Sequence, residues 1–316
     1  MTSPGQHSQH QDPFRAEFVS ARDRTAAILR LLPSGAQKSD ADRFESYARD
    51  NDIPLEWLWT IRNTAGKPST CLLAVPSPGR TAMLFTSQAT NPDQEERLSQ
   101  LIEHGAKYLE DQSIDLAQAL LLTTDRPGLS AFEQSGFRRL AILQYMETTV
   151  SRRLEFPVIP DGLELVAFEE SMRSQLIQAL DASYEDTLDC PALRGLRKTD
   201  DVITGHQSTG QFKASLWSIA LHHGAPAGAV LINQTKRGQQ AELVYIGMAA
   251  DIRGRGWGRT LLQHAMALAS EARLQQLSLA VDLNNTPALD LYTSMGFTAT
   301  GRRQAVIRST RSMQED

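Results

Sequence analysis

The segment "MAADIRGRGWGRTLLQHAMALA", Met248 to Ala269, decides how the second half of the chain is expected to fold. Three glycines, Gly254, Gly256 and Gly258, alternate there with arginine and tryptophan, and an apolar helical pattern follows at once. Three interpretations are open from these letters alone: a phosphate-binding loop, an arginine–glycine RNA-binding segment, or a structural turn. The sequence on either side distinguishes between them.

A strand is predicted before this loop and a helix after it. "AELVYIGM" (241–248) is rich in residues that favour strands, and residues 259–274 place their apolar side chains on one helical face. A helix that starts at a glycine-rich turn can bind phosphate, because its first backbone N–H groups are unpaired and its N-terminus is partly positive. RNA-binding segments of this composition are repeated, whereas this one occurs once. Its spacing matches neither GxxxxGK[ST] nor GxGxxG.

The overall composition predicts a globular protein with two domains. The chain has 316 residues, of which 41% are hydrophobic and 22% charged, and a net charge of -5 that argues against a nucleic-acid partner. The two cysteines, Cys71 and Cys190, are far apart and lack metal-ligand spacing, so no metal site is predicted. Because no apolar stretch is long enough for a bilayer and the first residues do not resemble a secretory signal, we expect a cytoplasmic protein without a membrane partner.

The order of predicted elements indicates a mixed α/β fold. In the second half, two strands form a hairpin, a third runs into the glycine loop, and helix, strand, helix and strand follow. The segment "SRRLEFPVIPDG" (151–162) combines two prolines with charges and is the best candidate boundary. We therefore expect a disordered tail (1–13), a first domain (14–152), a linker (153–162) and a second domain (163–316).

The first half repeats the pattern of the second half. "LSAFEQSGF" ends at Phe137 and "LDLYTSMGF" ends at Phe297, and the same offset matches Asp125 to Asn285. A pattern of strands, a long helix, a strand and a short helix precedes both positions. This indicates an internal duplication at the scale of a domain.

Two motifs in the second half resemble signatures of the GNAT acetyltransferase superfamily. "RGRGWG" fits the pattern [RQ]-x-x-G-x-[GA], with Arg253, Gly256 and Gly258 at the signature positions. "NNTPALDLYTSMGF" is similar to the family's N-x-x-A-x-x-L-Y-x-x-x-G-F block, which runs here from Asn285 to Phe297. The resemblance implies two tandem GNAT-like domains with one intact motif set.

The resemblance also implies acetyl-CoA as the acyl donor. Its pyrophosphate would bind the backbone amides between Arg253 and Arg259, and its pantetheine arm would pair with the end of the preceding strand. The implied cofactor-binding residues are Gly247, Met248, Arg253, Gly254, Arg255, Gly256, Trp257, Gly258, Arg259 and Asn285. The side chains of the arginines would add positive charge, and Asn285 equally fits a helix N-cap.

Acyl transfer to an amine needs a group that removes a proton from the amine and one that protonates the departing thiolate. Tyr292 occupies the position at which the family often places a tyrosine beside the sulfur of CoA, and is the candidate acid. Glu242 is the candidate base, since some family members carry a glutamate in this strand. A half-buried helix aromatic and a solvent-facing strand glutamate are the alternatives. Glu185, Asp186 and Asp189 form a weaker candidate for attracting a cationic amine.

The first half lacks both chemical features of the second. Its corresponding loop, "ATNPDQEER", has no glycine, and Asp93, Glu95 and Glu96 crowd the start of the helix, where they would repel a pyrophosphate. Phe132 stands at the position of the tyrosine. We therefore expect a degenerate domain that does not bind CoA in the usual way and that packs against the active half.

The predicted function is N-acetyl transfer from acetyl-CoA to a primary amine by direct attack. The acceptor stays open between a small-molecule amine and an amine of a peptide or protein. The alternative is a non-catalytic protein that binds acetyl-CoA as a regulator or scaffold. The oligomeric state also stays open, a homodimer being one option.

Overall fold

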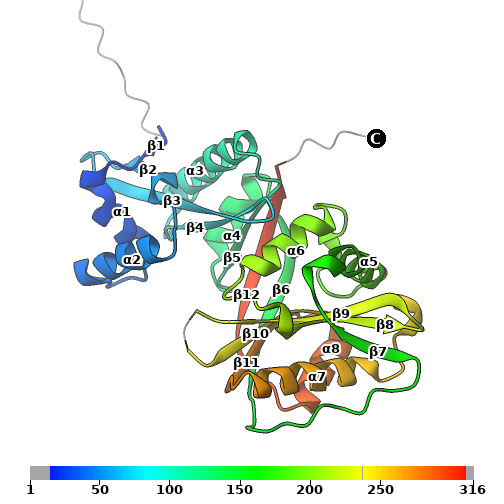
Figure 1. The fold of residues 1–316 in the computed structure, drawn as a ribbon. Coiled ribbons are helices and arrows are strands. Elements are labelled where there is room, and N and C mark those ends of the chain that lie inside the picture. Colours follow the sequence, from blue (N-terminus) through cyan, green and yellow to red (C-terminus); the bar gives the residue numbers. More distant parts are fainter. Residues whose placement is uncertain (1–14, 237, 311–316) are drawn as a thin grey trace, which may run out of the picture.

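The computed structural model of the chain describes residues 15–236 and 238–310. Within them, the strands form one 12-stranded sheet that runs through both halves of the molecule, with helices packed on its faces (Figure 1). The predicted mixed α/β class is confirmed. The disordered tail predicted for residues 1–13 lies outside the described residues.

The first half contains the predicted strands and helices, preceded by a two-residue strand and two helices that were not predicted. In chain order its elements are β1 (Glu17–Phe18), α1 (Arg24–Leu31), α2 (Lys38–Asp50), β2 (Leu58–Arg62), β3 (Pro68–Ser77), β4 (Thr81–Thr86), α3 (Pro92–Asp111), β5 (Leu116–Leu121), α4 (Arg126–Gln134) and β6 (Arg138–Thr149). Helices α1 and α2 had not been predicted. The sequence signal of α2 is weak, because this mostly polar helix buries only Ala41 and Ala48.

The second half follows the same plan. Its elements are β7 (Leu163–Ala167), α5 (Arg173–Tyr184), α6 (Thr199–Ser208), β8 (Trp217–His222), β9 (Ala225–Gln234), β10 (Gln240–Met248), α7 (Trp257–Glu271), β11 (Gln276–Asp282), α8 (Thr286–Ser294) and β12 (Thr298–Ser309). The segment 185–210 was predicted to consist of turns, and this was wrong for α6. That helix buries Ile203 alone, so it has no apolar period for a sequence pattern to detect.

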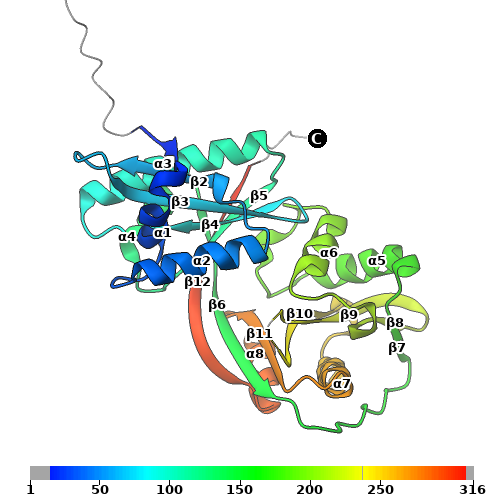
Figure 2. The same cartoon turned by 60° about the vertical axis from the view of Figure 1, so that its left-hand side comes forward.

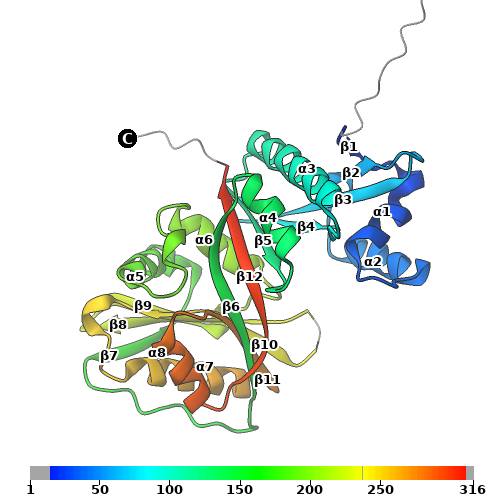
Figure 3. The ribbon, with the colours of Figure 1, turned by 180° about the vertical axis from the view of Figure 1, so that it is seen from behind.

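Each half contributes its last strand to the other half. Strand β6 of the first half pairs with β11 of the second, and β12 of the second pairs with β5 of the first. The two exchanged strands also pair with each other, and Figure 3 shows them side by side at the junction. The proposed boundary at 153–162, a segment without helix or strand, therefore divides the chain but not the sheet.

The exchange extends to the hydrophobic cores. Met146 and Val150, at the end of β6 and just after it, belong to the core of the second half. Val306 of β12 belongs to the main core of the first half and is fully buried there. Each core is thus completed by residues from the other half, and the two halves are expected to be stable only together.

The predicted repeat is present at the level of single elements. Helices α4 and α8 begin and end 160 positions apart, and so do β6 and β12. The glycines that follow the two helices, Gly136 and Gly296, have φ angles of +77° and +85°. Both halves therefore leave these helices through the same left-handed turn.

Two further findings concern the described residues only. None of their helices is long and apolar enough to cross a membrane. No group of three or more histidine, cysteine, aspartate or glutamate side chains is placed there to hold a metal ion.

Candidate functional site

Strands β10 and β11 pair only at their beginnings and then separate. Their parallel pairing covers Gln240–Glu242 and Gln276–Ser278. A β-bulge between Leu243 and Tyr245 bends β10 at the point where this pairing ends. Beyond the bulge, residues 243–248 and 279–281 line a cavity instead of bonding to each other. The open backbone edge of β10 is suited to pair with an extended ligand.

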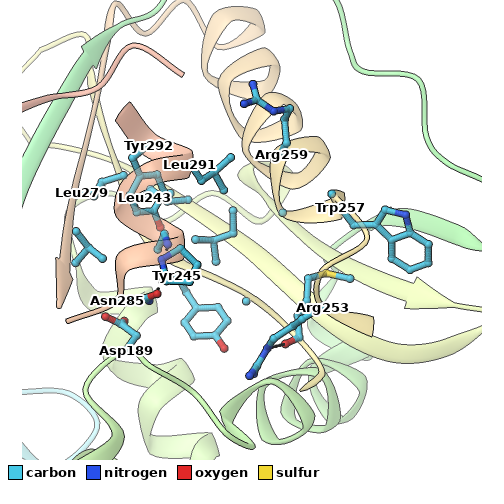
Figure 4. A pocket seen from close by; sticks show the side chains of 18 of the residues that line it. Asp189, Leu243, Tyr245, Arg253, Trp257, Arg259, Leu279, Asn285, Leu291 and Tyr292 are labelled. Carbon is cyan, nitrogen blue, oxygen red and sulfur yellow. Dashed lines mark hydrogen bonds between the residues drawn. The ribbon is translucent and has the colours of Figure 1, made fainter. Parts of the chain in front are cut away.

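The cavity between the separated strands has a volume of about 450 Å³. This lies within the range of roughly 300–1,000 Å³ that is common for small-molecule sites. Its walls come from β10, β11, the glycine loop with the start of α7, and α8 (Figure 4). The predicted cofactor-binding residues that line it are Gly247, Met248, Arg253, Gly254, Gly256, Trp257, Gly258, Arg259 and Asn285. Tyr292 lines the same cavity, whereas Arg255 does not.

The glycine loop presents unpaired backbone N–H groups to this cavity. Gly254 and Gly256 have φ angles of +78° and +81°, which other residues adopt only with strain. In the described chain, the N–H groups of residues 254–258 donate to no carbonyl oxygen, whereas those of Arg253 and Arg259 bond to Ala250 and Gly256. The first turn of α7 carries no acidic residue. The loop can therefore receive an anion.

The side chain of Arg253 is bound to the backbone of its own protein. Its Nε donates to the carbonyl oxygen of Met248 at 2.9 Å, and its Nη1 to that of Asp186 at 2.8 Å. Its Nη2 donates to the carbonyl oxygens of Ser183 and Glu185 at 2.9 and 2.8 Å. Arg253 thus ties the loop to the end of α5, and its guanidinium is committed to that contact rather than directed to a ligand.

The other two arginines of the segment differ in position. Arg255 is exposed, and its guanidinium carbon lies 5.3 Å from the centre of the Trp257 ring. Arg259 lines the cavity and donates to the Oγ of Ser294 at 2.7 Å and to the Sδ of Met295 at 2.8 Å. Arg259 therefore joins the start of α7 to the end of α8 beside the loop.

Tyr292 points from α8 into the cavity and is only 6% exposed. Its ring packs on that of Phe297, with centroids 5.7 Å apart. Burial raises the pKa of Tyr292, so the hydroxyl keeps its proton at neutral pH. Asn285 caps the same helix, because its Oδ1 accepts a hydrogen bond from the N–H of Ala288. The structure thus places both residues beside the glycine loop.

Glu242 is placed at the closed end of the gap between β10 and β11. It forms the last parallel pair, with Ser278, and is not among the residues that line the cavity of Tyr292. It instead lines a second cavity, of about 710 Å³. Desolvation raises the pKa of its carboxyl group above the usual value. The two predicted catalytic residues, Tyr292 and Glu242, therefore lie at neighbouring but separate cavities.

Two residues of the first cavity were not identified as important from the sequence: Tyr245 was not singled out, and Asp189 was only a weaker candidate. Tyr245 hydrogen-bonds Ser183 of α5, and burial raises the pKa of its phenol. The Oδ1 of Asp189 accepts from the N–H of Asp282 at 3.1 Å, and desolvation raises the pKa of its carboxyl. Asp189 thereby fixes the loop after α5 against the end of β11. No local motif identifies either residue, since their positions depend on how α5 packs on β10.

The corresponding loop of the first half contains no comparable anion site. The side chain of Asn91 accepts from the N–H of Gln94, and the side chain of Gln94 accepts from the N–H of Thr90. The first turn of α3 also carries Asp93 and Glu95. The start of α3 is therefore satisfied by its own side chains and bears negative charge, unlike the start of α7.

The comparisons with known proteins agree with this site. Residues 180–297 match the model of the Acetyltransferase (GNAT) family. Over 83 residues the chain is 34% identical to the 5-NmdU N-acetyltransferase of Pseudomonas phage PaMx11, which covers 26% of this chain and 57% of that protein. It is 26% identical over 176 residues to a mycothiol acetyltransferase of Actinosynnema mirum, covering 55% of this chain and 57% of that protein.

These matches span little more than half the length of either relative. The fold extends further. A GCN5-related N-acetyltransferase from Sphaerobacter thermophilus superposes with a TM-score of 0.62 at 17% identity, covering 96% of this chain and 97% of that one. The predicted resemblance is confirmed: residues 180–297 of this chain belong to the GNAT acetyltransferase family, within a fold of two GNAT-like halves.

Proposed function

We propose that the chain transfers an acetyl group from acetyl-CoA to a primary amine. The observation that carries this proposal is the first cavity, in which an anion-binding helix start, an open strand edge and a buried tyrosine hydroxyl face one space. Three parts of acetyl-CoA need these three features: its pyrophosphate, its pantetheine arm and its thioester.

The donor site is assigned to the glycine loop and to β10. The N–H groups of residues 254–258 would hold the pyrophosphate, and the backbone of Gly247 and Met248 would pair with the pantetheine arm. A loop of this kind needs no side-chain cation, which agrees with the engagement of Arg253 in backbone contacts. Arg259 adds positive charge at the rim of the cavity.

The transfer needs one proton removed and one supplied. A neutral amine attacks the thioester carbonyl, the C–N bond forms, and the C–S bond breaks with the electron pair leaving on sulfur. Tyr292, whose pKa is raised by burial, would donate its proton to that thiolate. Glu242, at the neighbouring cavity along β10, would accept the proton of the amine through a water molecule between them.

A non-catalytic regulator that binds acetyl-CoA is the second candidate. It would need the glycine loop but not a buried hydroxyl, so the position of Tyr292 favours the enzyme. The discriminating experiment measures CoA release from labelled acetyl-CoA with a panel of amines, and the mass of any product. Tight binding of acetyl-CoA without turnover of any amine would establish the regulator instead.

A further inference from the structure

The second cavity lies between the two halves of the chain. From the first half it is lined by the end of α2 and the residues after it, and from the second half by the end of α6 and the β9–β10 hairpin. The hairpin extends toward α2 in Figure 1, and α2 is seen again in Figure 2, turned by 60° from that view. The Nζ of Lys236 donates to the Oδ1 of Asn51 at 3.0 Å, which joins hairpin and helix end across the cavity.

Glu242 connects this cavity to the donor site. It pairs with Asn233 of β9, and Tyr245 pairs with Leu231 two positions away, so Glu242 and Tyr245 lie on the same face of the sheet. In a regular strand, residues three positions apart point to opposite faces, and the bulge between Glu242 and Tyr245 brings them to the same face. Glu242 lines the second cavity and Tyr245 the first. The two cavities therefore adjoin along β10.

The carboxylate of Glu242 has no protein partner in the described chain. The residue is half-buried, and desolvation alone raises its pKa, with no hydrogen bond or ion pair to offset it. An unpaired carboxylate at the base of a cavity favours a cationic ligand group. Asp50, at the end of α2, adds a second carboxylate to the lining. Both acids can thus face one bound ammonium-bearing molecule.

The remaining lining indicates the chemistry of that molecule. All lining side chains except Ile53 and Gly210 carry a hydrogen-bonding group. Such a surface does not desolvate an alkyl or aryl group favourably, but it matches a ligand with many hydroxyl or amide groups. The volume of about 710 Å³ suits a small molecule rather than a protein surface.

We propose that this second cavity is the acceptor site, that the first half of the chain forms one wall of it through α2, and that it takes a polyhydroxylated primary amine of the amino-sugar class. This inference rests on the proposed acetyl transfer. The amine lies beside Glu242 and reaches the thioester past the bulge of β10, along the face of the sheet that Glu242 shares with Tyr245. The degenerate half therefore determines the acceptor without touching the donor.

The test uses the full chain with four amines: glucosamine, spermidine, a lysine-containing tetrapeptide and hexylamine. Glucosamine is expected to give the highest kcat/KM, by about tenfold over hexylamine. Asp50→Asn and Ser208→Trp, which alter the cavity from opposite walls, should each raise the acceptor KM about tenfold. Both should leave the affinity for acetyl-CoA, measured by calorimetry, unchanged. Asp42→Asn, an exposed position on α2 outside the lining, is the matched control.

The outcomes separate this inference from the proposed function. A wild-type protein that acetylates none of the amines would overturn acetyl transfer itself and the acceptor site with it. If the wild type acetylates an amine but Asp50→Asn and Ser208→Trp both keep its acceptor KM, as the control Asp42→Asn should, only the position of the acceptor site is overturned. A highest kcat/KM for spermidine, the peptide or hexylamine would overturn the amino-sugar class. Melting curves of the variants identify any loss that comes from unfolding.

Discussion

Phe132 and Tyr292 occupy the same position in the two halves, 160 residues apart, and differ by one hydroxyl group. Each lies in a nine-residue helix, and each packs on a phenylalanine five positions later, with ring centroids 4.9 Å and 5.7 Å apart. Phe132 is fully buried, so this packing does not require the hydroxyl. The hydroxyl of Tyr292 is therefore available for chemistry.

Tyr292→Phe should lower kcat about 100-fold and leave the affinity for acetyl-CoA and the melting temperature near their wild-type values. The stability should not change, because Phe132 packs a phenyl ring at the corresponding position of the first half. The rate should fall, because the variant lacks the proton donor. Steady-state kinetics and calorimetry measure the two effects separately. Phe132→Tyr is the matched control and should leave kcat unchanged. Equal losses of kcat and of affinity in Tyr292→Phe would assign this residue to packing.

Gly256→Glu should weaken the binding of acetyl-CoA at least about 100-fold, because it places a carboxylate at the anion-binding start of α7. The residue has a φ angle of +81°, so any side chain adds backbone strain. Gly256→Ala carries the same strain without the charge and is the control, with an expected loss of a few-fold. Calorimetric titration of both variants gives the comparison. If they bind equally, the pyrophosphate does not lie on this loop.

Much of the lining of the first cavity could be predicted from sequence, because many of its residues are close together in the chain. Residues 253–259 and 285–297 contain half of the residues that line the first cavity, and β10 contributes residues 243–248. The lining of the second cavity could not, since it combines Asp50 with Glu242, nearly 200 positions apart. The strand exchange also has no local signal: β6 and β12 have the pattern of strands, but their partners depend on how both halves pack.

Arg253→Ala should lower the free energy of unfolding by about 1–2 kcal/mol, since four backbone carbonyls lose a charged donor. The loop should also loosen, which would weaken acetyl-CoA binding indirectly. Urea denaturation measures the stability. Arg255→Ala removes the same charge from the same loop without breaking a backbone contact, so its stability should stay within about 0.5 kcal/mol of wild type. Equal stability of the two variants would contradict the role assigned to Arg253.

Glu242→Gln should lower kcat/KM about 100-fold and yet raise the free energy of unfolding at neutral pH. Burial raises the pKa of Glu242 in the folded state, so its contribution to stability is full below the usual glutamate pKa and declines as pH rises through the raised one. Glutamine does not titrate and avoids this loss. The stability advantage of the variant should therefore disappear below about pH 4.

Denaturation of both proteins between pH 4 and pH 8 checks this effect. The pH–rate profile of the wild type should rise through a pKa above the usual glutamate value, because the base must be ionised to accept a proton. A variant that is less stable than wild type across the whole range would show that Glu242 is a structural group.

The exchange of β6 and β12 should make the two halves unfold as one unit. Arg308 of β12 donates to the carbonyl oxygen of Ser135 at 2.7 Å and forms ion pairs with Glu103 and Glu110, all in the first half. Its side chain is 17% exposed, so these contacts are poorly replaced by water. Arg308→Ala should lower the free energy of unfolding by about 2 kcal/mol in both halves at once.

Hydrogen exchange with mass spectrometry in increasing urea can follow segments of each half separately. The protected amides of β3 and β9, one strand from each half, should lose protection at the same urea concentration in the wild type and at the same lower concentration in Arg308→Ala. Arg139→Gln breaks an exposed ion pair with Glu133 that does not cross between halves, and should shift neither. If β3 loses protection in Arg308→Ala while β9 keeps it, the exchanged strands do not couple the halves, and the first half unfolds independently of the second.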